Sequence, residues 1–199
     1  MLDVFPMPRL LIATKNAHKT AEIRAILGSA WTIEDLNAHP EIAAPEETGD
    51  TFLANATIKA LAASQLFPGL VLSDDSGLEV DALGGAPGVR SARYAGEHAT
   101  AAEHRAKLLR ELREFPARAR FRCTLVLAEN GAVLGAFDGV VEGAIIAAER
   151  GAGGFGYDPI FVPDGHTETF AELSSAVKNE LSHRGRALRL ARARLTGGR

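Results

Sequence analysis

The sequence predicts an α/β fold with a mixed sheet. In the first half, short apolar runs that fit buried strands alternate with segments of helical periodicity, which is typical of parallel strands joined by helices. In the second half, alternating apolar and polar residues lead to Asn130-Gly131, a pair that favours a tight antiparallel hairpin. The length of 199 residues suits one domain, which we expect to span 1–199.

The first half predicts strands and helices in alternation. The expected strands cover 9–14, 31–36 and 70–73, and the expected helices cover 17–27, ended by Gly28, and 51–66, with Asp50 as N-cap. The third strand runs into Asp74-Asp75-Ser76-Gly77, a composition that suits a turn. We therefore expect this strand to end at Ser73.

The second half is richer in turn signals. A Gly-rich cluster over 84–88 predicts a turn, 100–114 predicts a helix, and 121–127 and 133–137 predict the strands of the hairpin, with Cys123 pointing inward. A short strand over 160–162 is expected next. A helical stretch from Phe170 and a last helix, capped by Ser182 and running to Leu195, complete the predicted elements.

Composition narrows the classes of partner. Lys and Arg total 22 against 25 Asp and Glu, and the resulting charge of −3 argues against a general nucleic-acid binder. A single Cys excludes an internal disulfide and a thiolate zinc site. No run approaches the roughly 20 apolar residues that cross a bilayer, and the N-terminal residues lack the apolar stretch of a signal peptide. We expect a cytoplasmic protein with no membrane partner.

Lysine is the rarer of the two basic residues here. Only five of the 22 are lysines, namely Lys15, Lys19, Lys59, Lys107 and Lys178. Where arginine is the default, a lysine suggests that a compact point charge was needed. Four of the five lie in segments that are unusual for other reasons.

Two of these segments have the character of phosphate-binding sites. Residues 14–19 stand where the first strand passes into the first helix, and free amides at a helix start bind phosphate, with Lys19 adding a mobile charge. Thr51, Asn55 and Lys59 recur every four residues and form a polar helix stripe with no acidic partner in it, which suits a line of donors facing an anion. The alternatives are an ordinary capped helix and a solvated helix face.

Two pairs of adjacent acids suit a hard metal ion. Glu46-Glu47 lies in a polar loop and Asp74-Asp75 follows the apolar run 70–72. Mg²⁺ binds one or two carboxylates together with substrate phosphates. A plain turn over 74–77 is the alternative, but it leaves two neighbouring like charges beside an apolar strand without compensation.

Two segments near the C-terminus could recognise a base. Gly151, Gly153 and Gly156 match G-x-G-x-x-G, yet the sequence after them leads into an extended segment, so we reject dinucleotide binding. A flexible loop that exposes Phe155 and Tyr157 for stacking fits better, with a core Phe as the equal alternative. Lys178-Asn179 and Ser182-His183-Arg184 gather donors near a helix junction, or serve only as caps and surface charge.

These segments together resemble the inosine/xanthosine triphosphate pyrophosphatase family. The resemblance rests on ATKNAHKTAE (13–22), EETGDTFLANATIKA (46–60), SDDSGLEVDALGGAPGVRSARYAG (73–96), GGFGYDPIFVP (153–163) and KNELSHRGRA (178–187). Each segment alone is a weak signal. Five in the family's order, over nearly the whole chain, are highly specific.

The resemblance implies an elongated mixed sheet flanked by helices, two lobes with a nucleotide cleft between them, and a homodimer. It implies Mg²⁺-dependent hydrolysis of ITP, dITP and XTP to the monophosphate and pyrophosphate. Asp75 takes the role of catalytic base, and Asp75 and Glu46 that of metal ligands. The substrate contacts that it implies are Thr14, Lys15, Asn16, Ala17, His18, Lys19, Ser76, Phe155, Gly156, Tyr157, Asp158, Lys178, His183 and Arg184, to which the helix stripe adds Lys59.

Two other functions are compatible with the same segments. A pyrophosphatase of related fold that acts on pyrimidine or modified nucleotides would share the phosphate-binding residues and differ in the base pocket. A nucleotide sensor that does not hydrolyse its ligand needs the phosphate cradle but no base, so the two acid pairs count against it.

Overall fold

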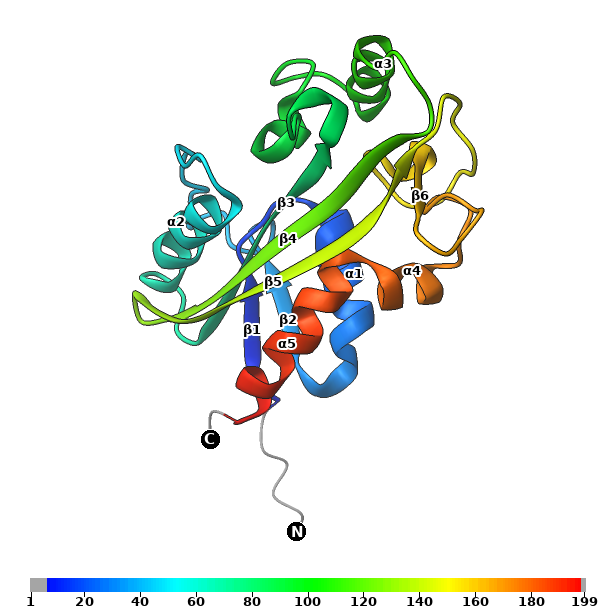
Figure 1. The fold of residues 1–199 in the computed structure, drawn as a ribbon. Helices are drawn as coiled ribbons and strands as arrows, with labels where there is room; N and C mark the ends of the chain where they lie inside the picture. Colours follow the sequence, from blue (N-terminus) through cyan, green and yellow to red (C-terminus); the bar gives the residue numbers. More distant parts are fainter. Residues whose placement is uncertain (1–6, 198–199) are drawn as a thin grey trace. The chain divides into compact units, whose positions relative to one another are not determined.

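The computed structural model describes residues 7–197, so most of the N-terminal segment considered for a signal peptide lies outside it. Within this range lie strands β1 (Arg9–Ile12), β2 (Thr32–Asp35), β3 (Leu70–Val80), β4 (Ala117–Glu129), β5 (Ala132–Ile145) and β6 (Phe161–Pro163), and helices α1 (Ala17–Leu27), α2 (Phe52–Ser64), α3 (Ala101–Glu111), α4 (Ser175–Leu181) and α5 (His183–Gly197) (Figure 1). No helix in the described part is long and apolar enough to cross a membrane.

The strands form one mixed sheet, as predicted. Their order is β2-β1-β3-β4-β5-β6. β1 pairs in parallel with β2 and β3, whereas β5 and β6 are antiparallel. Asn130 and Gly131 have φ of 51° and 75°, which are the positive values that a two-residue hairpin turn requires, so the predicted hairpin between β4 and β5 is confirmed.

The chain divides into two compact units. The first unit holds the residues up to Asp75, Thr124–Phe137 and the chain from Leu188 onward, and the second holds Ser76–Cys123 and Asp138–Ala187. In the first unit, Ala56 and Ala60 of α2 are fully buried and form a cluster with Val126 and Ala128 of β4. Ser73 donates to the carbonyl of Ala56 over 2.6 Å. This packing seats α2 beside β3.

The second unit has an aromatic core. The rings of Phe121 and Phe161 lie 4.7 Å apart, edge to face, and Phe170 stacks on Phe121 at 6.0 Å. The imidazole of His183 also stacks on Phe121, with the ring centroids 4.9 Å apart and an angle of 11° between the planes. The core therefore fixes the plane of His183, the first residue of α5.

Several expected boundaries are wrong, among them those of β4 and β5, which extend well beyond the expected 121–127 and 133–137. Three others are explained by contacts in the structure. β3 does not end at Ser73 but continues to Val80, because Asp74 and Asp75 find lysine partners and need no turn to reach water. Thr51, not Asp50, caps α2, accepting a hydrogen bond from Ala54 N–H over 3.1 Å. No helix starts at Phe170, because its amide donates to Phe161 O over 3.0 Å; the helix α4 begins at Ser175.

Gly139 in β5 is expected to tolerate no side chain. A Cβ there would overlap the carbonyl of His183 and stand 2.6 Å from the amide nitrogen of Ala187, both backbone groups of α5. Gly139→Ala should therefore displace the first turns of α5 and lower the free energy of unfolding by about 1–3 kcal/mol, measured in urea.

Gly135→Ala in the same strand is the matched control. Its Cβ would meet the ring of Phe137 at 3.0 Å, and a side chain can rotate away at a smaller cost. Equal stability of the two variants would contradict the close approach of α5 to β5.

Candidate functional site

A buried cluster of lysines and carboxylates lies along β3 in the first unit. Lys59 Nζ donates to Asp75 Oδ1 and to Glu47 Oε1, each over 2.8 Å, and to the carbonyl of Asp74 over 3.0 Å. Lys19 Nζ donates to Asp74 Oδ1 over 2.6 Å. Lys59, Asp74 and Asp75 are all buried. Neither lysine is a solvated surface charge, and the acidic partners of Lys59 come from outside the helix stripe.

Asn55 ties the acidic loop to this cluster. Its Oδ1 accepts a hydrogen bond from Gly49 N–H over 2.8 Å, and its Nδ2 lies 3.5 Å from Asp75 Oδ2. Asn55 is fully buried, although Leu53 on the same helix is half exposed. Asn55 and Lys59 of the stripe therefore face polar partners inside the unit, which excludes the solvated-face alternative for these two residues, whereas Thr51 is exposed and caps the helix.

Burial and charge act in opposite directions on the central pair. Burial raises the pKa of Asp75, and the nearby Lys59 only partly opposes this. For Lys59, burial alone would lower the pKa, but the charges of Asp75 and Glu47 outweigh it, so the pKa is raised and the ammonium persists. A carboxylate with a raised pKa is a better proton acceptor near neutral pH than a surface aspartate.

The start of α1 is capped by its own chain. Asn16 Oδ1 accepts from His18 N–H over 3.0 Å and from Lys19 N–H over 3.2 Å. These two amides are therefore occupied by the cap in this structure, which departs from the expectation of free amides. Thr14 is partly buried, while the following four residues are exposed: Lys15, Asn16, Ala17 and His18.

A second group of polar residues surrounds Phe155 in the second unit. Asp158 Oδ2 accepts from Phe155 N–H over 2.7 Å and from Lys178 Nζ over 2.5 Å. Lys178 Nζ lies 4.9 Å from the centre of the Phe155 ring, and the guanidinium of Arg184 lies 5.8 Å from it. Arg184, with 1% of its surface exposed, donates to Ser76 Oγ over 3.0 Å. The predicted residues 76, 155, 158, 178 and 184 are thus brought together.

In the glycine-rich loop, one of the two aromatic side chains expected to be exposed is buried. Phe155 and Gly156 are partly exposed, but Tyr157 is buried and its hydroxyl donates to the carbonyl of Ser91 over 3.0 Å. Burial raises the pKa of Tyr157. Tyr157 is therefore a structural anchor and not a stacking surface. The loop leads into a short 3₁₀ turn and β6, not a helix, which confirms that it is no dinucleotide-binding motif.

The carboxylates of the first unit fit a hard cation that takes most of its ligands from elsewhere. Among residues 7–197 there is no group of three or more Asp, Glu, His or Cys placed to hold a metal ion. Asp75 offers buried carboxylate oxygens, while Glu46 is exposed in the adjoining loop. Such a donor set suits Mg²⁺, which keeps water and substrate phosphate oxygens as ligands.

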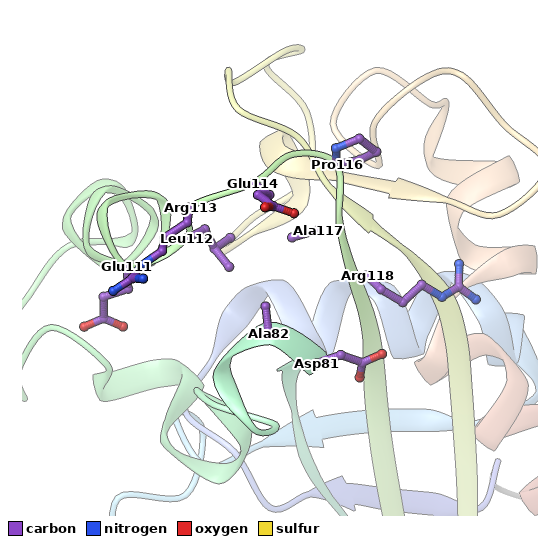
Figure 2. A pocket seen from close by; sticks show the side chains of 9 residues that line it. All are labelled: Asp81, Ala82, Glu111, Leu112, Arg113, Glu114, Pro116, Ala117 and Arg118. Atoms are coloured by element: carbon purple, nitrogen blue, oxygen red, sulfur yellow. The ribbon is translucent and has the colours of Figure 1, made fainter.

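A recess in the second unit carries none of the predicted site residues. It has a volume of about 720 Å³ and is lined by Asp81, Ala82, Glu111, Leu112, Arg113, Glu114, Pro116, Ala117 and Arg118 (Figure 2). Asp81 is paired with Arg120 over 2.9 Å, and Arg118 with Asp164 over 2.7 Å. Its lining offers no cluster of catalytic groups.

Three residues of these clusters were not predicted as site residues from the sequence. Glu47 and Asp74 were predicted only as members of the two acidic pairs, and the resemblance assigned the site roles to Glu46 and Asp75 instead. Asn55 was predicted only as one donor of the period-four stripe, without a partner in the protein. The contact with Gly49 that gives Asn55 its role is not encoded in any local pattern.

Known proteins are similar to this chain in sequence and in fold. The Ham1 family profile matches residues 10–194. A dITP/XTP pyrophosphatase of Halalkalibacterium halodurans is 48% identical over 92% of this chain and 96% of its own, and one of Geobacter sulfurreducens is 47% identical over 92% and 94%. A HAM1 protein of Coxiella burnetii, covering 96% of this chain and 100% of its own, superposes with a TM-score of 0.86 at 41% identity. The chain belongs to the Ham1 family.

Proposed function

We propose that this protein hydrolyses deaminated purine nucleoside triphosphates, namely ITP, dITP and XTP, to the monophosphate and pyrophosphate, and so removes them from the nucleotide pool. The observation that carries the proposal is the buried arrangement of Lys59 between Asp75 and Glu47, with Lys19 on Asp74 beside it. Two lysines and three carboxylates offer both phosphate-binding charge and a base. The relatives named as dITP/XTP pyrophosphatases support the choice of substrate.

In this proposal the cluster of the first unit serves the phosphates. Lys19 and Lys59 bind phosphate oxygens and stabilise the negative charge that develops during displacement at phosphorus. Asp75 accepts the proton of the attacking water at its carboxylate, for which its raised pKa is suited. Asp75 and Glu46 would hold Mg²⁺, which when bound neutralises phosphate oxygens and orients them. Residues 14–18 are proposed as further contacts of the phosphate chain.

The group around Phe155 serves the base. Phe155 offers a ring for stacking on a purine, and His183 and Arg184 offer donors for a 6-keto oxygen. The 6-amino group of ATP would leave such a buried donor unpaired, which costs about 1–3 kcal/mol per group. The buried Asp158 acts through its bonds to Phe155 and Lys178, so we assign it a positioning role in place of the predicted direct contact.

The proposed function also suggests where the protein acts and how it assembles. The nucleotide pool lies in the cytoplasm, which we propose as the location. A homodimer is proposed from the family resemblance, and light scattering of the purified protein tests it. The formal charge of −3 supports a nucleotide in place of a nucleic acid as partner.

A panel of three nucleotides tests the proposed function. Pyrophosphate release is measured with ITP, dTTP and ATP at fixed Mg²⁺. Release from ITP well above release from dTTP and ATP is the expected result. Preference for dTTP would favour the enzyme acting on pyrimidine nucleotides, and tight binding of ITP without release would favour the sensor.

Replacing the two lysines of the cluster should weaken triphosphate binding. A charge-assisted hydrogen bond contributes about 1.5–3 kcal/mol, so Lys19→Ala and Lys59→Ala should raise the Kd for a triphosphate by about 10- to 100-fold in calorimetric titrations. Since Lys59→Ala also leaves Asp75 and Glu47 without their shared cation, its folding is checked by thermal melting.

Lys107→Ala is the control for both variants. Lys107 donates to the carbonyl of Tyr94 over 2.7 Å and lies over the Tyr94 ring, in the second unit. Its loss should leave the Kd unchanged. If the three variants bind the triphosphate equally well, the assignment of Lys19 and Lys59 to phosphate binding is wrong.

A further inference from the structure

Arg105 of α3 holds both ends of the loop that carries Phe155. Its Nε and Nη2 pair with the two carboxylate oxygens of Glu149 over 2.8 and 3.0 Å, and its Nη1 donates to the carbonyl of Gly156 over 2.7 Å. Only 13% of the Arg105 side chain is exposed. Because the guanidinium is planar and the pair with Glu149 is bidentate, the orientation of the third donor is fixed.

The bond to Gly156 completes the restraint of Phe155. On the N-terminal side, Phe155 N–H donates to the buried carboxylate of Asp158. On the C-terminal side, the Gly156 carbonyl is held by Arg105, and the next residue, Tyr157, is anchored through Ser91. Phe155 itself is partly exposed, so packing alone does not immobilise it. Polar contacts on either side therefore restrain the backbone that carries its ring.

We propose that Arg105, oriented by Glu149, is a specificity-determining positioning residue: it fixes the Phe155 ring for stacking on the base of the nucleotide, and the stacked base then presents its 6-position to Arg184, whose guanidinium lies 5.8 Å from the centre of that ring. The inference rests on the proposed function, since it assigns Phe155 to the base. α3 packs into the core of the second unit through Leu108, which is fully buried, whereas the side-chain hydrogen bonds of Arg105 go to Glu149 and Gly156. Replacing Arg105 therefore acts on the loop and not on the phosphate-binding cluster.

Two variants and one control test this role. Arg105→Lys keeps the charge but loses the planar fork, and Glu149→Gln keeps the side-chain shape but loses the charge that orients Arg105. Arg110→Gln changes an exposed arginine of the same helix. Steady-state kinetics are measured with ITP and ATP, and inhibition is measured with inorganic tripolyphosphate, which has phosphates but no base.

In Arg105→Lys and Glu149→Gln, KM for ITP should rise about tenfold with kcat changed less than about twofold. The preference for ITP over ATP should fall about tenfold, while the inhibition constant of tripolyphosphate stays at the wild-type value. Arg110→Gln should resemble the wild type in every measurement. A purely structural role would instead lower stability and weaken tripolyphosphate inhibition together with ITP binding.

An unchanged preference for ITP in the folded variants overturns the role of Arg105, as does an equal loss of tripolyphosphate inhibition. Wild-type protein that releases no pyrophosphate from ITP overturns the proposed function instead. In that event, calorimetric binding of IMP, which keeps the base, decides the inference. Weaker IMP binding in the two variants than in Arg110→Gln supports it, and equal binding overturns it.

Discussion

Asp75→Asn is expected to lower kcat for ITP by about 10²- to 10⁴-fold, the range that general acid–base catalysis contributes. An amide cannot accept the proton of the attacking water and is a poor ligand for Mg²⁺. The asparagine has the size of the aspartate, and its carbonyl oxygen can still accept the hydrogen bond that Lys59 Nζ makes with Asp75 Oδ1 over 2.8 Å. The fold should therefore survive the change.

Asp35→Asn is the matched control for this prediction. Asp35 is also a buried carboxylate of the first unit, at the end of β2, where it accepts a hydrogen bond from Asn37 N–H over 3.0 Å. It has no place in the lysine cluster, so its replacement should leave kcat near the wild-type value. Near-normal turnover of folded Asp75→Asn would remove Asp75 from the mechanism.

The strand that carries Asp75 shows how far local sequence patterns reach. The apolar run 70–72 predicted a strand and the adjacent acids predicted a site, and the strand is confirmed. The pattern could not show that β3 continues through Asp74 and Asp75, because what keeps them inside the sheet is distant in sequence. Lys19 is 55 residues from Asp74, and Lys59 is 16 residues from Asp75.

The scarcity of lysine identified cations whose environments are indeed special. Lys19, Lys59 and Lys178 each form a close ion pair with an aspartate, at 2.6, 2.8 and 2.5 Å. Composition selected these positions because Arg and Lys differ in geometry, but it gave no information on their partners. The sequence predicted phosphate as the anion that these lysines would face, and in this structure the anions that they meet are carboxylates of the protein.

The glycine-rich loop contains a second feature that local sequence patterns could not predict. Phe155 and Tyr157 lie two residues apart in the same glycine-rich segment, and the sequence predicts exposure for both. Their burial differs because the carbonyl of Ser91, more than sixty residues away in the sequence, accepts a hydrogen bond from the Tyr157 hydroxyl. Arg105, which holds the same loop at Gly156, lies on a helix that carried no motif at all.

Removing Arg184 or His183 should narrow the preference for ITP over ATP. We expect ITP and XTP to be preferred over ATP and GTP by about 100-fold or more in kcat/KM, or roughly 3 kcal/mol. Arg184 is buried, donates to Ser76 Oγ and lies near the Phe155 ring, while His183 is held by stacking on Phe121. Donors fixed in this way discriminate strongly between ITP and ATP, because they cannot turn away from the 6-amino group of ATP.

GTP provides the internal comparison, since it also has a 6-keto group. Its rejection must come from a second feature near the 2-position of the base. Arg184→Ala and His183→Ala should therefore narrow the ITP/ATP ratio of kcat/KM more than the ITP/GTP ratio. Arg184→Lys, which keeps a charge in the buried position, and thermal melting of each variant separate this effect from loss of folding.

The measurement is a competition series with ITP, XTP, ATP and GTP at fixed Mg²⁺. An unchanged ITP/ATP ratio in folded His183→Ala and Arg184→Ala would mean that the keto group is recognised elsewhere. The backbone amides of residues 155–158 would then be the next candidates for donating to the keto group. Phe155 N–H already donates to the Asp158 carboxylate, and Asp158 N–H to the Phe155 carbonyl. Recognition would then fall to the amides of Gly156 and Tyr157, the part of the loop that Arg105 holds in place.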